Sequence, residues 1–237
     1  MEHAVTAMIE FALLVQECAP HVNVSTMAAI VRQESAGNPL AIGVNGGVRL
    51  PRQPRSKAEA ISTAEWLKTT GYNFDAGIGQ INVRNRDWLG MSIEDLFDPC
   101  ANLKGAAKVL SDCYERASTR YGEGQSALRA ALSCYNTGNF STGFRNGYVM
   151  KVAANAALPI PALKPIAQDP REPVKLRPSP TASAVKEGSQ PAGEHHRQQP
   201  GNEDDAGLGD AFSRAAGDAF RTSTVQEDAR NGEKSKM

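Results

Sequence analysis

The stretch MAAIVRQESAG, residues 27–37, places a carboxylate on the apolar face of a predicted helix. Met27, Ile30 and Val31 recur at helical spacing, and Glu34 continues the same face seven residues after Met27. The pattern calls for a core residue at this position, and the sequence supplies an acid instead. Glu34 is therefore the first residue to consider for a chemical role.

Two effects are expected to raise the pKa of Glu34. Burial disfavours the charged carboxylate, and the last turn of a helix disfavours negative charge. A glutamic acid that stays protonated near neutral pH is the proton donor needed for glycoside cleavage. The position alone does not establish this role, because a glutamate at a helix end is more often solvated, and Arg32 is close enough to compensate its charge.

Helical periodicity over the first 158 residues predicts a mainly α-helical domain, and no convincing alternating strand is found. Ser25 or Thr26 is expected to cap the second helix, and Asp98 or Asn102 the fourth. Residues 40–55 are rich in Gly, Pro and Arg and are expected to be irregular, with at most a small hairpin. The predicted helices cover residues 4–18, 25–36, 57–70, 102–119, 125–136 and 146–157.

The composition changes near Leu158. Residues 159–237 hold nine of the 14 prolines and two aromatic residues, Phe212 and Phe220, among scattered charges of both signs. Such a segment buries too little apolar area to offset its ordering entropy. We therefore expect one domain over residues 1–158 and a disordered tail over residues 159–237.

Overall charge and residue usage exclude several classes of protein. The formal net charge of the 237 residues is zero, which does not favour a nucleic-acid binder held by phosphate contacts. No apolar run is long enough to span a membrane. The four histidines and four cysteines show no zinc-binding spacing. Neither a metal nor an organic cofactor is implied.

The four cysteines, Cys18, Cys100, Cys113 and Cys134, favour two disulfides formed in an oxidising compartment, with four buried thiols as the alternative. Cys100 and Cys113 lie at about 20 Å from each other if the fourth helix is real, so they cannot pair. Two pairings remain. Cys113 and Cys134 lie at similar distances from the turn that joins the fourth and fifth helices, which favours Cys113–Cys134 and leaves Cys18–Cys100.

Three short motifs follow one another along the chain: ESAGNP at residues 34–39, GIGQIN at 77–82 and ALSCYNTG at 131–138. In this order they resemble the lysozyme-like lytic transglycosylases of the soluble Slt type. Further stretches, among them RQP at 52–54, GYNF at 71–74 and FDPC at 97–100, look like the lytic transglycosylase subunit of type IV secretion systems. The similarity covers roughly residues 10–155.

The resemblance implies a lysozyme-like fold with a substrate groove between two lobes. It also implies cleavage of peptidoglycan glycan strands between N-acetylmuramic acid and N-acetylglucosamine. Glu34 matches the catalytic acid, and capture by the substrate's own C6 hydroxyl would leave a 1,6-anhydromuramoyl end. The expected substrate-binding residues are Ser35, Asp75, Gln80, Asn82, Tyr135 and Asn136, with Ser35 orienting the surroundings of the acid.

The resemblance also implies type IV secretion system components as partners and the periplasm as location. Residues 1–19 lack Lys and Arg, and Glu10 interrupts their apolar run, so no signal peptide is evident. Gly79 stands where the family often has Met, which predicts a more open groove wall. Asp75 is expected to be a polar loop residue, or else to stabilise a positive transition state or activate water.

Two other functions remain open. A lysozyme-type hydrolase would release reducing ends by water attack, and Asp75 is the feature that would support it. A catalytically idle peptidoglycan-binding assembly module would need no acid, and the intact motifs argue against it.

Overall fold

The computed structural model describes residues 2–166 and 173–176. It is mainly helical, as expected. The helices are α1 (Glu2–Cys18), α2 (Val24–Ser35), α3 (Lys57–Thr69), α4 (Arg86–Leu89), α5 (Pro99–Tyr121), α6 (Gln125–Thr137), α7 (Thr142–Arg145) and α8 (Tyr148–Ala156). Short 3-10 helices cover Val83–Asn85 and Asp95–Phe97.

Two helix starts differ in detail from expectation. The side chain of Asn23, rather than of Ser25 or Thr26, caps α2 by accepting a hydrogen bond from the backbone N–H of Ser25 at 2.9 Å. Asp98 caps α5 as expected, and Pro99 occupies its first turn. α5 therefore begins three residues earlier than the apolar periodicity alone indicated.

A three-stranded antiparallel sheet was not expected. Its strands are β1 (Ile42–Val44), β2 (Phe74–Ala76) and β3 (Ile81–Asn82), in the order β1-β2-β3. Strands of two or three residues are too short to show an alternating pattern, so the sequence did not reveal them. The hairpin considered within residues 40–55 is wrong, because β1 pairs with β2 from beyond α3.

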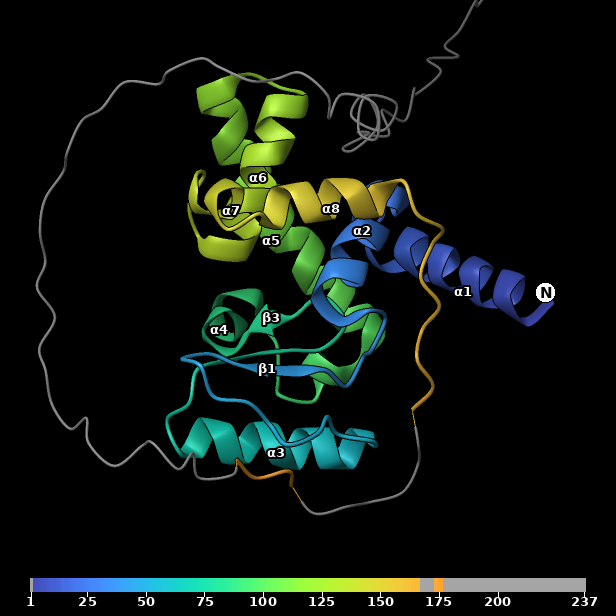
Figure 1. The fold of residues 1–237 in the computed structure, drawn as a ribbon, viewed down its shortest axis with the longest axis vertical. Coiled ribbons are helices and arrows are strands. Elements are labelled where there is room, and N and C mark those ends of the chain that lie inside the picture. The colour runs from blue at the N-terminus through green and yellow to red at the C-terminus, as the bar shows by residue number, and fades with distance from the viewer. Residues whose placement is uncertain (1, 167–172, 177–237) are drawn as a thin grey trace, which may run out of the picture.

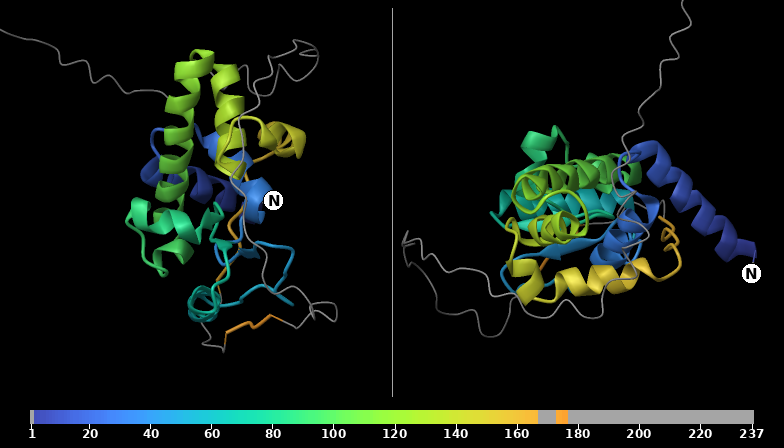
Figure 2. Two further views of the ribbon diagram at one scale, coloured as in Figure 1. Left: turned by 90° about the vertical axis from the view of Figure 1, so that its left-hand side faces the viewer. Right: turned by 90° about the horizontal axis from the view of Figure 1, so that it is seen from above.

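An upper part of the molecule contains α6, α7 and α8, and a lower part contains the sheet, α3 and α4 (Figure 1). The long α5 packs on β3 at one end and on α6 along its length, and the two helices stand side by side in the left view of Figure 2. The core is one large cluster of buried apolar side chains that spans both parts, and a small second cluster, Ala117, Ala127 and Ala130, lies between α5 and α6. Among the described residues, no helix has the length and apolarity of a membrane span.

Both disulfides predicted from the sequence are confirmed. Cys18 pairs with Cys100, which ties the end of α1 to the start of α5. Cys113 pairs with Cys134, which joins the antiparallel helices α5 and α6. The expected similar heights of Cys113 and Cys134 on neighbouring helices correspond to a Cα–Cα distance of 5.8 Å.

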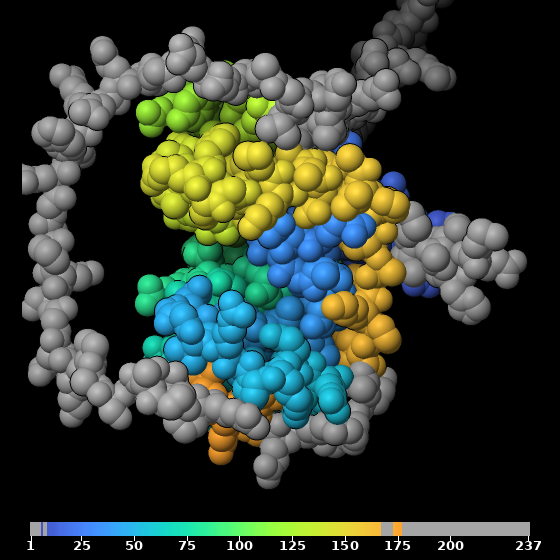
Figure 3. All heavy atoms as spheres, viewed as in Figure 1, coloured from blue at the N-terminus to red at the C-terminus, as the bar shows by residue number. Residues whose placement is uncertain are grey.

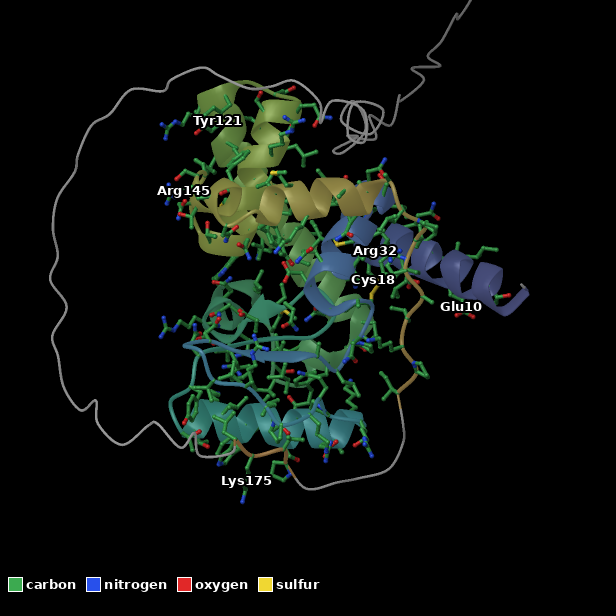
Figure 4. The ribbon with its side chains drawn as sticks, viewed as in Figure 1. Glu10, Cys18, Arg32, Tyr121, Arg145 and Lys175 are labelled. Carbon is green, nitrogen blue, oxygen red and sulfur yellow. A yellow bond between two sulfur atoms is a disulfide. The ribbon has the colours of Figure 1, made fainter. Side chains whose placement is uncertain are left out.

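Parts of the expected tail pack on the domain beyond Leu158. The backbone N–H of Lys164 donates to the carbonyl oxygen of Gly37 at 2.8 Å, and that glycine leaves no room for a Cβ beside residue 162. Val174 is 5% exposed, and its N–H donates to Thr63 Oγ1 of α3 at 2.8 Å. Its neighbour Lys175 points away from α3 (Figure 4).

These contacts extend the packed chain past the expected boundary at Leu158. The boundary was placed too early because the average composition of residues 159–237 is polar, although a few apolar residues within them pack on the domain. The contacting side chains include Ile160, Leu163 and Leu176. The remainder of the expected disordered tail, 167–172 and 177–237, lies outside the described residues.

Truncation tests how much these contacts stabilise the domain. A chain of residues 1–158 should fold but have a lower free energy of unfolding than a chain of residues 1–176, by about 1–3 kcal/mol, because Val174 and its neighbours lose their burial. Thermal unfolding of the two chains measures the difference. Equal melting temperatures would show that the contacts add no net stability.

Candidate active site

A groove of about 580 Å³ lies between the upper and lower parts. Figure 3 shows the surface receding between α7 and α8, in yellow, and the region of the sheet below them. The groove brings together six residues singled out from the sequence, which come from α2, β2, β3, α6 and the turn before β3: Glu34, Asp75, Gln80, Asn82, Tyr135 and Asn136.

Glu34 lies in the last turn of α2 and is partly buried at the groove. Its Oε1 accepts a hydrogen bond from Tyr148 Oη at 2.5 Å. Burial raises the pKa of Glu34 from 4.5 to about 7, the Tyr148 hydrogen bond opposes this rise, and the negative charge of Asp75 adds to it. The raised pKa expected from the sequence is thus confirmed, with burial as its main cause.

Asp75 is a strand residue, so the expectation of a polar loop residue is wrong. It lies in β2, where it pairs with Gly43 of β1 and Asn82 of β3. Asn82 Nδ2 donates to its Oδ1 at 2.7 Å, and Asn45 Nδ2 donates to its Oδ2 at 3.0 Å. Burial raises the pKa of Asp75, while the two amides act in the opposite direction. Both carboxylate oxygens therefore have fixed orientations at the groove.

Gln80 and Ser35 hold the turn between β2 and β3. Gln80 has a left-handed backbone, with φ of 50°, which is strained for a residue with a side chain. Its Nε2 donates to the carbonyl oxygens of Ala41 and Gly77 at 3.0 and 2.9 Å. Ser35 Oγ donates to the carbonyl oxygen of Ile78 at 2.8 Å, and Ser35 does not line the groove. Ser35 thus positions α2 against the turn.

Tyr135 is tied to the same turn. Its Oη donates to the carbonyl oxygen of Gly79 at 2.6 Å. Burial, together with the negative charges of Glu34 and Asp75, raises the pKa of Tyr135 well above its usual value, so the phenol stays neutral. The next residue, Asn136, accepts a hydrogen bond from Asn146 Nδ2 at 2.9 Å and is exposed at the groove.

The wall at Gly79 is closed, contrary to the expectation of a more open groove. A Cβ added there would lie 2.9 Å from Ala106 Cβ and 3.2 Å from Tyr135 Oη. Neighbouring side chains therefore fill the space that a larger residue at this position would take.

Tyr148 was not predicted as a site residue, although a helix was expected over this position. Tyr148 is 5% exposed, and burial with the nearby Glu34 charge raises its pKa well above the usual value. Nothing in the local pattern links Tyr148 to a carboxyl 114 residues earlier in the chain.

Other groove residues were missed as well. Trp88 lines the groove at 47% exposure, and Lys108 Nζ lies 5.1 Å from its ring centroid. The tryptophan itself is the only local signal in the sequence, because its exposure and the polar groove are visible only in the structure. Polar residues also missed at the groove are Asn45, Asn73, Asn85, Asp112, Arg116 and Thr137. Among the described residues, no cluster of His, Cys, Asp or Glu suits a metal ion.

A family model and several known proteins match this chain. The model of the transglycosylase SLT domain matches residues 12–158. The type IV secretion system protein virB1 of Brucella suis biovar 1 (strain 1330) is 49% identical over 184 residues, covering 75% of this chain and 74% of that protein. Protein virB1 of Rhizobium radiobacter is 40% identical over 167 residues, covering 70% of this chain and 69% of that protein. No solved structure matches the chain significantly.

The raised pKa of Glu34 makes stability depend on pH. A carboxyl whose folded-state pKa is raised contributes stability that is fully present below its unfolded pKa and is lost as the pH rises through about 7. Replacing Glu34 by Gln removes this dependence. Relative to wild type, Glu34→Gln should therefore gain about 2–3 kcal/mol in free energy of unfolding between pH 4.5 and pH 8.

Denaturant unfolding of both proteins at several pH values measures this gain. Glu115→Gln, which changes an exposed carboxyl on α5, is the matched control. A Glu34→Gln difference that stays constant from pH 4.5 to pH 8 would contradict the raised pKa.

Proposed function

This chain belongs to the transglycosylase SLT domain family, and on that basis we propose that it cleaves peptidoglycan glycan strands as a lytic transglycosylase. The bond cleaved is the β-1,4 bond between N-acetylmuramic acid and N-acetylglucosamine, and the product carries a 1,6-anhydromuramoyl end. The observation that carries the proposal is Glu34, an acid with a pKa of about 7 at a polar groove.

Glu34 acts first as acid and then as base. Its carboxyl proton passes to the oxygen that links the two sugars, the bond from that oxygen to the muramoyl C1 breaks, and positive charge develops at C1. The C6 hydroxyl of the same sugar then attacks C1 and gives its proton to the Glu34 carboxylate. The sugar supplies the nucleophile, so one carboxyl completes the cycle, unlike the scheme that uses two.

Neutral phenols and amides support this cycle. Tyr148 donates to Glu34 Oε1 and fixes the orientation of the carboxyl. The groove also offers Gln80, Asn82 and Asn136 for the hydroxyl and acetamido groups of the sugars, with Tyr135 beside them. Trp88 presents a half-exposed ring on which the apolar face of a sugar can stack. Ser35 contributes by positioning the turn after β2.

Asp75 supports a second candidate, a lysozyme-type hydrolase. Its carboxylate lies at the groove with both oxygens fixed by amides, and its charge acts on Glu34. In the transglycosylase scheme Asp75 stabilises the positive charge at C1. In a hydrolase it would activate the attacking water, and the product would carry a reducing end.

The relatives suggest the cellular process in which the reaction takes part. The relative at 49% identity is named as a type IV secretion system protein, so we propose that this chain opens the wall locally for assembly of such a system and contacts its components. The two disulfides favour a location outside the cytoplasm, and the wall substrate points to the periplasm.

We also propose that residues 1–158 contain all groups needed for cleavage and that residues 159–237 are dispensable for the chemistry. The support is that each groove residue lies before position 139 and that Tyr148, which contacts the acid, lies in α8.

Replacing Glu34 by Gln should abolish cleavage. The amide is nearly isosteric but cannot give and recover a proton, so the rate on purified sacculi should fall by about a hundredfold to ten-thousandfold. Mass spectrometry of the released muropeptides measures both rate and product. Wild type should release anhydro ends, which are lighter by one water than hydrolysis products.

Full activity of Glu34→Gln would show that another residue is the acid. A wild-type protein that binds sacculi but releases nothing would identify an idle binding module.

Replacing Asp75 by Asn should lower the rate by about tenfold and leave the anhydro product unchanged, because the developing charge at C1 loses one stabilising carboxylate. The same muropeptide assay measures this. A loss as deep as that of Glu34→Gln, together with reducing ends from wild type, would support the hydrolase instead.

A further inference from the structure

An ion pair on the wall of the groove has no role in the proposed cycle. Asp112 and Arg116 lie one turn apart on α5, and both line the groove. Arg116 Nη2 and Nε lie 2.7 and 3.0 Å from Asp112 Oδ2. Both side chains are about half exposed, at 52% and 53%, so substrate in the groove can reach them.

The Arg116 guanidinium has more contacts than the ion pair with Asp112 alone provides. Arg116 Nη2 also lies 3.2 Å from Cys134 Sγ and 3.6 Å from Cys113 Sγ of the disulfide, and the guanidinium carbon lies 5.8 Å from the Phe140 ring centroid. An isolated, exposed i,i+4 pair would be loosely oriented and would contribute little to stability. Among the described residues, none accepts a hydrogen bond from Nη1, so this nitrogen is available to a ligand.

The pair lines the same groove as the acid. Arg116 Nη2 lies 3.2 Å from Cys134 Sγ, and the next residue on α6, Tyr135, lines the groove together with Glu34. The cleaved bond starts at N-acetylmuramic acid, the sugar that carries the peptide stem. A group that binds the stem would therefore line the same groove as Glu34.

The charges fit the stem better than the glycan. The sugars are neutral apart from their substituents and need no fixed cation. The stem presents carboxylates and carbonyl oxygens for a guanidinium, and N–H or ammonium groups for a carboxylate. A donor and an acceptor held side by side match a peptide, which offers both.

We propose that Asp112 and Arg116 bind the peptide stem of the muramic acid residue at the cleavage site, so that the enzyme prefers peptide-bearing strands to bare glycan. Arg116 Nη1 donates to a carboxylate or carbonyl oxygen of the stem, and the second oxygen of Asp112, Oδ1, accepts from an N–H group. This inference rests on the proposed function, since it assigns part of the substrate to the same groove.

The test compares two substrates with the full chain. One is soluble, uncrosslinked glycan strands that carry peptide stems, and the other is the same strands after an amidase has removed the stems. Wild type should show a kcat/KM at least tenfold higher on peptide-bearing strands. In Arg116→Gln this preference should fall to about one, through a higher KM on peptide-bearing strands and with kcat little changed.

Two further variants separate recognition from packing. Arg116→Lys keeps the positive charge but loses the planar guanidinium, and should retain part of the preference for peptide-bearing strands. Arg120→Gln, one turn along α5 and outside the groove beside Tyr121, should retain all of it. If Arg116→Gln lowers kcat/KM equally on both substrates, the side chain only supports the fold, and the proposal is wrong.

Binding measurements keep this test independent of catalysis. Calorimetry on the Glu34→Gln background compares the affinity of each strand type with and without the Arg116→Gln change. If Arg116→Gln weakens the affinity for peptide-bearing strands tenfold and leaves the affinity for bare strands unchanged, stem recognition is supported even if the protein cleaves nothing. Equal affinities for both strand types on the Glu34→Gln background would overturn it.

Discussion

The buried amide of Asn102 is the contact on which the active site depends. It accepts a hydrogen bond from the N–H of Gly79 at 2.7 Å and donates to the carbonyl oxygens of Ala76 and Leu96 at 3.0 and 2.8 Å. Each of these groups would cost about 1–3 kcal/mol if left unpaired in the interior. A Cβ on Gly77 would lie 2.2 Å from the amide nitrogen, so this turn can pack on α5 only with glycine.

The turn so fixed is where the three sequence motifs meet. Ser35 from α2 donates to the carbonyl oxygen of Ile78, and Tyr135 from α6 donates to that of Gly79. The helix that carries Glu34 and the helix that forms the opposite wall are therefore both anchored to one short piece of backbone. Two hydroxyl groups that sequence comparison would assign to substrate are thus engaged within the protein.

The two carboxyl groups of the groove have different surroundings, which act differently on their pKa values. Glu34 has one hydrogen-bond donor and is partly buried, and this burial raises its pKa to about 7. Asp75 has an amide on each oxygen, which opposes the effect of its burial. An acid that keeps its proton beside a hydrogen-bonded carboxylate is the arrangement that glycoside cleavage needs. The same groove adds a charge pair, Asp112 and Arg116, which we propose binds the peptide stem.

The sequence by itself determined what depends on neighbours along the chain. Helical spacing gave the main helices, placed Glu34 on an apolar face and, with helix lengths, decided both disulfide pairings. Only the tertiary structure decided what depends on packing between distant segments. Strands of two or three residues form because their partners meet there, and Asn102, predicted only as a possible cap, became a buried anchor. Tyr148 reaches Glu34 because α8 packs on α2, and Arg116 faces the groove because α6 folds back along α5, contacts that no local pattern encodes.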